Sequence, residues 1–333
     1  MIRNAQTLLE RIRAIHAEIR DEVLIATQQS SLEQLSAIVA EEGGDTIFAI
    51  DRVSEEVLLR HFEQLGQEWS FVLIAEGLGE DGRAVFPAGT SPEEAELRII
   101  IDPIDGTRGL MYQKRPAWIL TGVAPNRGEA TSLADIEIAV QTEIPLLKQY
   151  LSDSFWAIEG SGARGERLDH FTGKREPLPP HPSQAQTIAQ GYGSIARFFP
   201  GGRAELAAID DEVIEQTLGP TRAGKVLAFE DQYISTGGQL SEMMMGHDRW
   251  IADLRPLLAT HRRAGLCCHP YDLCTELIAR EAGILLTDER GERLRAPLDV
   301  FTNMAWIGYA NQAIARQVRP VLSALLRQYG LVE

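Results

Sequence analysis

Residues 98–107 read Arg-Ile-Ile-Ile-Asp-Pro-Ile-Asp-Gly-Thr, a run of β-branched residues that ends on two carboxylates, a proline, a glycine and a hydroxyl. The three isoleucines favour a buried strand, because no polar residue alternates with them. Pro103 has a fixed φ and no N–H, so we expect the chain to turn just after Asp102. Asp102 and Asp105 would then lie close together, where their charges repel unless a cation or a proton lies between them. Oxygen ligands of this kind suit Mg²⁺, Mn²⁺ or Ca²⁺.

Two further carboxylates stand where chain ends are expected to meet above a sheet. Glu76 follows the apolar run Phe71–Ala75, which predicts a strand, and Asp272 opens a stretch that predicts a helix over 272–282. A carboxylate in the first turn of a helix is stabilised by the helix dipole and by free N–H groups. Taken alone, Asp272 is explained by a simple N-cap and Glu76 by a solvated loop. Four acids at one site, however, repel too strongly to stay ionised without cations.

Together these segments resemble the inositol monophosphatase superfamily of Mg²⁺-dependent, lithium-sensitive phosphatases, which includes fructose-1,6-bisphosphatases and 3′-phosphoadenosine-5′-phosphate phosphatases. Residues 102–107 match its core motif, and 74–76 match the strand with its metal-binding glutamate. Residues 45–51 resemble its first acidic strand and turn, while 271–274 with 281–283 resemble its second motif. The matching segments follow the family order from about residue 45 to 310.

For the metal centre, the resemblance implies two or three Mg²⁺ ions, with Mn²⁺ as an alternative and with Ca²⁺ and Li⁺ as inhibitors. The ligands of one ion would be Glu76, Asp102 and the carbonyl oxygen of Ile104. The ligands of a second ion would be Asp102, Asp105 and Asp272. A third ion has less support, because Gly77 follows Glu76 where the superfamily usually has a second acid.

For catalysis, the resemblance implies that Glu76 helps to hold a metal-activated water and that Thr107 orients it, paired with the acid that matches Asp51. The water attacks the phosphate ester directly, without a covalent phosphoenzyme. The backbone N–H groups at an expected helix start would face the phosphate. The residues implied to contact the substrate are Gly106, Thr107, Arg108 and Asp272.

Several positions differ from inositol monophosphatases and bear on the substrate. Residues 108–110 are Arg-Gly-Leu in place of the common Asn-Phe, which looks more like the bisphosphate nucleotidase branch. Gly265 stands seven residues before Asp272, where an inositol-binding acid is expected, and Asp253 is a candidate replacement.

Two cations just beyond the core motif, Lys114 and Arg115, either form a solvated turn or clamp a second anionic group. We therefore expect a phosphomonoesterase for a small phosphorylated metabolite, inositol-phosphate-like or another polyol or sugar phosphate. The alternatives are a 3′(2′),5′-bisphosphate nucleotidase, a fructose-1,6-bisphosphatase-like enzyme and, outside enzymes, an inactive metal-binding scaffold.

The rest of the chain must supply elements that position these residues. Apolar residues at helical spacing over 4–42 predict two helices, and a helix over Ser54–Gln64 is expected to be capped by Ser54. Other predicted helices are 203–217, 238–246, 272–282 and 311–328. Other predicted strands are Thr46–Ile50, Trp118–Ala124, Ile136–Gln141, Phe155–Ile158 and Trp306–Tyr309. Trp118 and the methionines at 243–245 are expected in the core. Residues 235–240 either resemble a turn of the superfamily near the substrate pocket or form a tight strand-to-helix turn capped by Thr236 or Ser235.

This alternation and the resemblance imply an α/β (α+β) fold, a layered αβαβα sandwich of the sugar-phosphatase type. A polar stretch rich in Gly and Pro at 160–185 is the best candidate boundary. We expect an N-terminal domain, 1–182, with most metal ligands, and a C-terminal domain, 183–333, that completes the metal and substrate site.

Composition limits the partners. The 333 residues carry a net charge of −16, which argues against a nucleic acid polymer or a membrane surface as partner. The first residues are polar and charged, and no run of about 18 apolar residues occurs, so a cytoplasmic protein is expected. A homodimer is implied by the resemblance alone.

The three cysteines, Cys267, Cys268 and Cys274, are odd in number and bunched, which is not the pattern of a disulfide framework. With His269 they form an alternative zinc set, but adjacent cysteines lack the usual two-residue gap. Reduced, partly buried thiols are the expected state.

Overall fold

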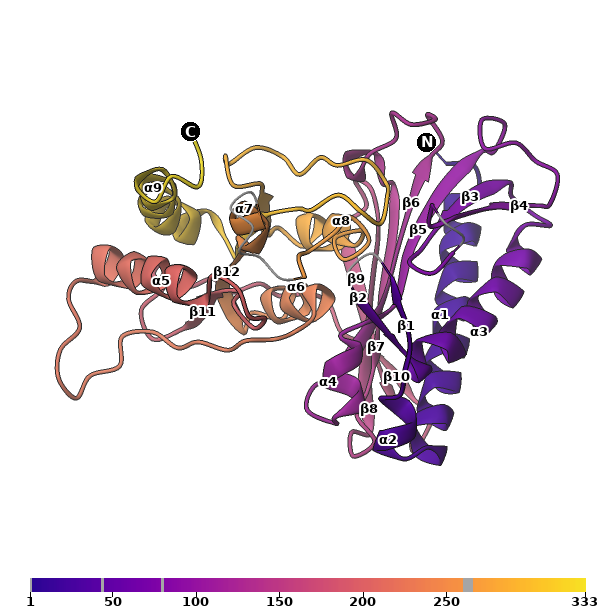
Figure 1. The fold of residues 1–333 in the computed structure, drawn as a ribbon, viewed down its shortest axis with the longest axis horizontal. Coiled ribbons are helices and arrows are strands. Elements are labelled where there is room, and N and C mark those ends of the chain that lie inside the picture. The colour runs from indigo at the N-terminus through magenta and orange to yellow at the C-terminus, as the bar shows by residue number, and fades with distance from the viewer. Residues whose placement is uncertain (1, 43–44, 79–80, 260–265) are drawn as a thin grey trace.

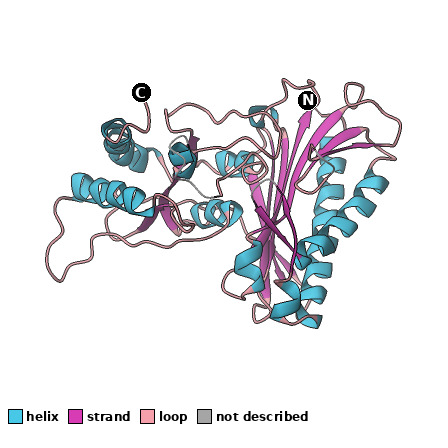
Figure 2. Cartoon of the chain, viewed as in Figure 1, coloured by secondary structure: helices cyan, strands magenta, loops and turns pink. Residues whose placement is uncertain are grey.

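Helices and sheets alternate in layers through the molecule (Figure 1, Figure 2). The computed structural model describes residues 2–42, 45–78, 81–259 and 266–333. A large sheet has helices on both faces, and a smaller sheet shares the middle helices and carries its own outer helices. The predicted αβαβα sandwich is therefore confirmed.

The large sheet has the strand order β10-β9-β8-β7-β6-β5-β3-β4, and its described neighbours are antiparallel except for the parallel pair β3 and β5. Its strands are β3 (Phe71–Ile74), β4 (Arg83–Phe86), β5 (Leu97–Asp105), β6 (Ala117–Pro125), β7 (Ile138–Ile144), β8 (Leu151–Ile158), β9 (Ala163–Asp169) and β10 (Arg175–Pro177). Helices cover both faces of the central strands, so β3 and β7 are buried along their whole length.

The outer face of the large sheet is covered by α1 (Ala5–Gln29) and α3 (Ala49–Leu65). Leu8, Ile12 and Ile19 recur at helical spacing on α1 and are fully buried in one cluster with residues of the central strands. The chain between these helices forms α2 (Leu32–Leu35) and the hairpin β1 (Ile38–Glu42) and β2 (Asp45–Phe48).

The middle layer holds α6 (Thr236–Met244) and α8 (Glu276–Glu281). Their apolar residues join one core cluster with Leu120 and Phe155 of the large sheet and with Ile251 and Trp306 of the small sheet. Trp118 and the three methionines at 243–245 belong to the same cluster, as expected. One core therefore bridges the two sheets.

The small sheet has the order β11-β12-β14-β13. Its strands are β11 (Tyr192–Ile195), β12 (Asp248–Asp253), β13 (Leu285–Thr287) and β14 (Trp306–Tyr309), and its outer helices are α5 (Arg203–Leu218) and α9 (Gln312–Gln328). The short helices are α4 (Thr107–Met111), α7 (Arg255–Ala259) and the 3₁₀ turn η1 (Leu133–Asp135). The segment 178–191 links the two sheets without a helix or strand, and the proposed domain boundary falls within it.

Several predicted elements near the N-terminus are wrong. The second helix expected within 4–42 is reduced to the four residues of α2, and Ile38–Glu42 forms a strand. Pairing with β2 explains the change, because β-branched residues fit a paired strand better than a helix. Helix α3 begins at Ala49, so Ser54 lies inside the helix and is not its N-cap.

Two strands, β9 and β10, lie in the polar stretch that we predicted as a boundary. They form one edge of the large sheet, where partly exposed strands need no apolar run. The predicted helix at 272–282 begins only at Glu276, after a series of turns. Within the described ranges, no helix is both long enough and apolar enough to span a membrane.

The contact of β6 with the turn before α8 is testable at Gly122. A Cβ there would lie 2.6 Å from the carbonyl oxygen of Cys274 and 2.6 Å from Cδ1 of Ile136. Since backbone cannot yield cheaply, we expect Gly122→Ala to lower the free energy of unfolding by about 1–3 kcal/mol in a denaturant titration. Gly109→Ala, within α4, is the control, because its Cβ would lie 3.4 Å from its nearest neighbours, the Cβ and carbonyl oxygen of Arg115. Equal stability of Gly122→Ala and the wild type would contradict this packing.

Candidate active site

The core motif sits on a bulge at the end of β5. Strand β3 pairs with β5 only as far as Ile100, so beyond that residue β6 is the remaining neighbour. The register with β6 shifts between Asp102 and Asp105, which lie opposite Leu120 and Trp118. Pro103, without an N–H, is tolerated there because no ladder bond is needed on the β3 side. The strand thus continues to Asp105 and does not end at Asp102 as predicted.

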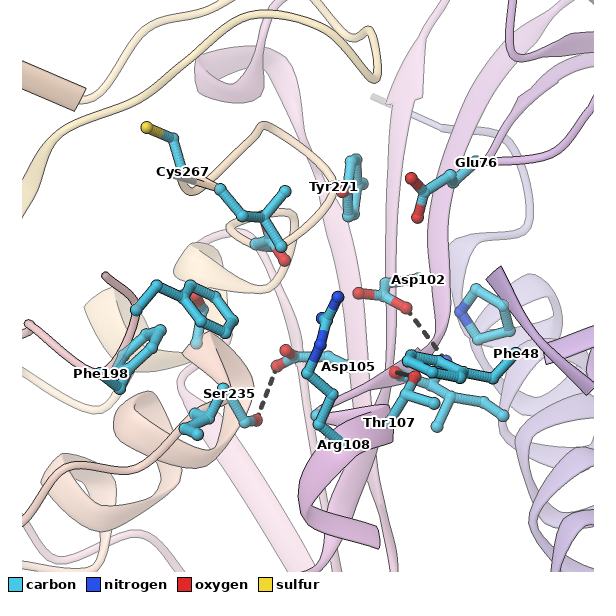
Figure 3. A pocket seen from close by; sticks show the side chains of 18 of the residues that line it. Phe48, Glu76, Asp102, Asp105, Thr107, Arg108, Phe198, Ser235, Cys267 and Tyr271 are labelled. Atoms are coloured by element: carbon cyan, nitrogen blue, oxygen red, sulfur yellow. Dashed lines mark hydrogen bonds between the residues drawn. The ribbon is translucent and has the colours of Figure 1, made fainter. Parts of the chain in front are cut away.

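Three carboxylates meet at this bulge, and two of them, Asp102 and Asp105, are labelled in Figure 3. One oxygen each from Asp102, Asp105 and Asp272 lies within 4.8 Å of the other two. Asp272 comes from the turn before α8, where its Oδ2 accepts a hydrogen bond of 2.7 Å from the His269 N–H. The carboxylate is thus oriented by a turn and not by the first turn of a helix. The predicted meeting of these three acids is present in the structure.

Hydrogen bonds hold the acids in place. Asp105 Oδ2 accepts the Ser235 hydroxyl at 2.8 Å and the Gly237 N–H at 2.6 Å. Ser235 Oγ also accepts the Gly238 N–H at 2.8 Å and so caps α6, as one of our two interpretations of that turn predicted. Asp102 Oδ1 accepts the Ile104 N–H at 3.0 Å. The start of α6 is therefore tied directly to the core motif.

The carboxylates repel one another inside the protein. Burial raises the pKa of Asp105 to about 6, against the hydrogen bonds that lower it. The pKa of Asp102 is raised well above its usual range, first by burial and then by Asp105, Asp272 and Glu76. Burial and Asp105 likewise raise the pKa of Asp272. The Arg255 guanidinium lowers the pKa values of Asp105 and Asp272 but does not outweigh the causes that raise them. Such a buried set of oxygen ligands fits a hard divalent metal ion.

The other predicted site residues surround this cluster. Glu76, at the end of β3, lines the same cavity. The Thr107 hydroxyl, at the start of α4, donates a hydrogen bond of 2.8 Å to the Ile104 carbonyl oxygen. Gly106 precedes it with φ of 98°, a left-handed conformation that favours glycine. Asp51 lies in the first turn of α3, but its side chain is outside the described part of the structure.

Aromatic and cationic side chains line the rest of the cavity, which has a volume of about 120 Å³. The Arg108 guanidinium lies 5.5 Å from the ring centroid of Phe48 and 5.3 Å from that of Phe199. The Arg255 guanidinium lies 4.2 Å from the ring centroid of Phe198. Neither Arg255 nor the two neighbouring phenylalanines were predicted as site residues from the sequence. Their single signal was an aromatic pair ahead of a Pro-Gly-Gly segment.

Asp253, the candidate replacement for an inositol-binding acid, has a different role. It is fully buried at the end of β12 and pairs with Arg255, whose Nε lies 2.9 Å from Asp253 Oδ1. Arg255 Nη1 also donates to the Leu266 carbonyl oxygen at 2.8 Å. Asp253 therefore positions Arg255 in the cavity wall. Gly265, the other position considered, lies outside the described residues.

The cations at 114–115 do not line the cavity. Arg115 instead forms an ion pair with Asp231 and lies over the Tyr233 ring, which favours a structural role. The three cysteines are buried and unbridged, and burial raises the pKa of each thiol. Within the described ranges, the group of candidate metal ligands contains acids and no cysteine.

Several solved structures are similar to this chain over nearly its whole length. A fructose-1,6-bisphosphatase from Leishmania major in holo form is similar with a TM-score of 0.71 at 15% identity, over 98% of this chain and 96% of that chain. The extragenic suppressor protein suhB from Bartonella henselae is similar with a TM-score of 0.65 at 14% identity, over 95% and 98%. An inositol monophosphatase from Anabaena (Nostoc) gives a TM-score of 0.57 at 17% identity, over 98% and 97%.

No protein-family model and no curated protein matches the chain. The solved structures show that the chain has the fold of inositol monophosphatases and fructose-1,6-bisphosphatases. The resemblance drawn from the sequence motifs is confirmed at the level of that fold.

The fit of a divalent ion can be tested without any substrate. Saturating Mg²⁺ or Mn²⁺ should stabilise the protein in EDTA-treated samples by about 2.7 kcal/mol at about 100 times the Kd. Asp105→Asn should abolish this gain and should melt higher than the wild type in EDTA at pH 8, because it removes a buried charge. Asp169→Asn, at the end of β9 and outside the carboxylate cluster, is the control and should keep the gain. An unchanged metal response in Asp105→Asn would contradict the site.

Proposed function

We propose that this protein is a Mg²⁺-dependent phosphomonoesterase for a small phosphorylated metabolite. The observation that carries the proposal is the buried carboxylate cluster of Asp102, Asp105 and Asp272 beside Thr107, on a fold shared with phosphatases. The same proposal includes a cytoplasmic location, a homodimer and the division into domains 1–182 and 183–333.

The proposed metal ligands are those implied by the motifs. Asp102 interacts with all the other proposed acidic ligands, since its pKa is raised by burial and then by Asp105, Asp272 and Glu76. The Ile104 carbonyl and Glu76 would complete the set on the side of β3. When bound, divalent ions supply an activated water at neutral pH and neutralise the phosphoryl oxygens. Phosphate esters need both effects because they hydrolyse extremely slowly unaided.

The chain's own groups orient the reactants. The Thr107 hydroxyl donates its proton to Ile104, so toward a water it acts as a hydrogen-bond acceptor and can orient the attack. We assign Asp51 as the acid paired with Thr107: with the Ile104 carbonyl on a metal ion, the Thr107 hydroxyl would donate to the Asp51 carboxylate in its place and would still accept from the water. The N–H groups of Gly106 and Thr107, together with the Arg108 guanidinium, are assigned to the phosphoryl oxygens.

Phosphate release from an aryl phosphate tests the activity itself. The wild type should turn over in Mg²⁺ and not in EDTA. Thr107→Val, which keeps the shape and removes the hydroxyl, should lower kcat by about 10²–10⁴-fold with little change in KM. Thr302→Val, at a hydroxyl bonded to Asp299 outside the cavity, is the matched control and should retain wild-type kcat. Absence of turnover with every divalent ion would refute the enzyme proposal.

A second candidate function, hydrolysis of a bisphosphate such as a 3′(2′),5′-bisphosphonucleotide or fructose 1,6-bisphosphate, is favoured by the cavity wall. The carboxylate of Asp253, the candidate for binding inositol hydroxyls, already accepts a hydrogen bond from Arg255. Arg255 and Arg108 offer cations, and Phe198 and Phe199 offer flat apolar faces. Such a wall suits a second anionic group or a planar ring more than a bare polyol.

The double variant Asp253→Asn with Arg255→Gln tests this choice, because removing both charges leaves no buried charge unpaired. If a second anionic group binds here, KM for fructose 1,6-bisphosphate and 3′-phosphoadenosine 5′-phosphate should rise about tenfold or more. KM for inositol 1-phosphate should change by less than about threefold, which provides the internal control. Equal changes for all three substrates would argue against a bisphosphate.

A further inference from the structure

A second cavity, of about 220 Å³, lies between α1 and the strands β7 to β10. It is on the other face of the large sheet from the carboxylate cluster. Thr142 of β7 bonds to His16 of α1, whereas the adjacent Gln141 bonds to the Gly237 carbonyl oxygen of α6. Since Asp105 also contacts α6, the sheet itself separates the two cavities.

One wall of this cavity is a face of α1. Arg13, Ala14, Ala17 and Arg20 line it, and the spacing of three to four residues puts 13, 17 and 20 on one side of the helix. The alanines leave room beside the arginines. The Arg13 guanidinium lies 3.6 Å from the ring centroid of Trp156 on β8, which holds it in place.

The opposite wall is made by strand residues that share one face of the sheet. Thr142, Ser154 and Glu166 lie opposite one another on β7, β8 and β9, and Arg175 comes from the edge strand β10. The Thr142 and Ser154 hydroxyls lie 3.0 Å apart and hydrogen-bond each other. The strands therefore contribute two hydroxyls, one carboxylate and a third guanidinium.

Charge is unbalanced within this lining. Glu166 is its one carboxylate, and it accepts Arg13 at 2.9 Å and also pairs with Arg175. Arg20 pairs through Nε and Nη2 with Asp21, whose side chain is 56% exposed and lies outside the lining. Arg20 itself is only 4% exposed. Three guanidinium groups thus face one carboxylate in a protein whose net charge is −16.

Unused donors point to an anion. Among the described residues, Arg20 Nη1 and the Nε and Nη1 of Arg13 make no hydrogen bond. Guanidinium groups are the usual ligands of phosphate because they bind its oxygens in pairs. Burial lowers the pKa of the neighbouring His16 to about 3, with further lowering by Arg13 and Arg20, as expected beside excess positive charge.

We propose that this arginine cavity binds a small multivalent oxyanion, a free phosphate or the phosphoryl group of a metabolite. Arg13, Arg20 and Arg175 would bind the oxygens. Since the Thr142 and Ser154 hydroxyls hydrogen-bond each other, one of the two would donate its remaining proton to the anion. The proposal does not depend on the proposed phosphatase activity, because none of these residues belongs to the carboxylate site.

Titration calorimetry with the full chain in EDTA tests the proposal, since the metal-free carboxylate site repels anions. Inorganic phosphate and glucose 6-phosphate are the two probes. Saturable binding of either probe, with one site per chain, supports the proposed site. The probe that binds shows whether the ligand is free phosphate or the phosphoryl group of a metabolite. Arg13→Gln, Arg20→Gln and Arg175→Gln should each weaken binding by about tenfold or more. Arg175 is half-exposed on an edge strand, so its variant is informative even where the buried Arg20 variant fails to fold.

Two control variants assign the binding to this cavity. Arg11→Gln, on α1 but exposed and paired with Glu68, should bind as the wild type does. Arg108→Gln, in the other cavity, should also keep wild-type affinity. Binding that is lost in Arg108→Gln but kept in Arg13→Gln and Arg175→Gln would overturn the proposal. So would the absence of saturable binding of both probes at millimolar concentration.

A local optical readout separates specific binding from general salt effects. Trp156 lies under Arg13, so phosphate that draws this guanidinium away should change tryptophan fluorescence in the wild type. The change should be lost in Trp156→Phe and should not be reproduced by chloride at equal ionic strength. An equal response to chloride would indicate screening and would contradict a phosphate site.

Discussion

The arrangement of this molecule depends on electrostatic repulsion among carboxylates that are held close together inside a protein. Asp102, Asp105 and Asp272 place oxygens within 4.8 Å of one another, and burial is the first cause of the raised pKa of each. Such a cluster lowers the stability of the metal-free fold. Hydrogen bonds from backbone N–H groups to all three acids hold them in place. The divalent cation that we propose would reverse the sign of the local interaction.

The layered architecture supplies that positioning from three distant parts of the chain. A bulge after the last β3 pairing turns the end of β5, the capped start of α6 holds Asp105 through Ser235 and Gly237, and the turn before α8 presents Asp272. Helices α6 and α8 belong to the core cluster that joins both sheets. The same packing that stabilises the sandwich therefore also fixes the geometry of the cluster, and small changes such as a Cβ at Gly237, 3.0 Å from Asp105 Oδ2, would reach the site directly.

Local chemistry made much of this predictable from the sequence. The apolar run before Asp102 predicted a buried strand, and the resemblance of the motifs to a known superfamily implied which acids converge. Predictions failed where pairing with another segment decides the secondary structure. Ile38–Glu42 is a strand because it pairs with β2, and β9 is a strand because it pairs with β8. The bond from Ser235 to Asp105 and the use of Asp253 to hold Arg255 join elements that no local pattern relates. The arginine cavity was missed for the same reason, since its cations come from α1 and β10.

Two cavities of opposite charge thus flank the large sheet, one lined by acids and one by arginines, in a fold shared with inositol monophosphatases and fructose-1,6-bisphosphatases. The acidic one carries the central proposal, that a divalent metal centre is built on Asp102, Asp105 and Asp272. Crystals grown with Mn²⁺ and measured for anomalous scattering test it most directly. The proposed centre requires Mn²⁺ peaks bonded to all three carboxylates. Well-ordered crystals in which this cluster holds no Mn²⁺, or in which Mn²⁺ binds only elsewhere, would contradict it.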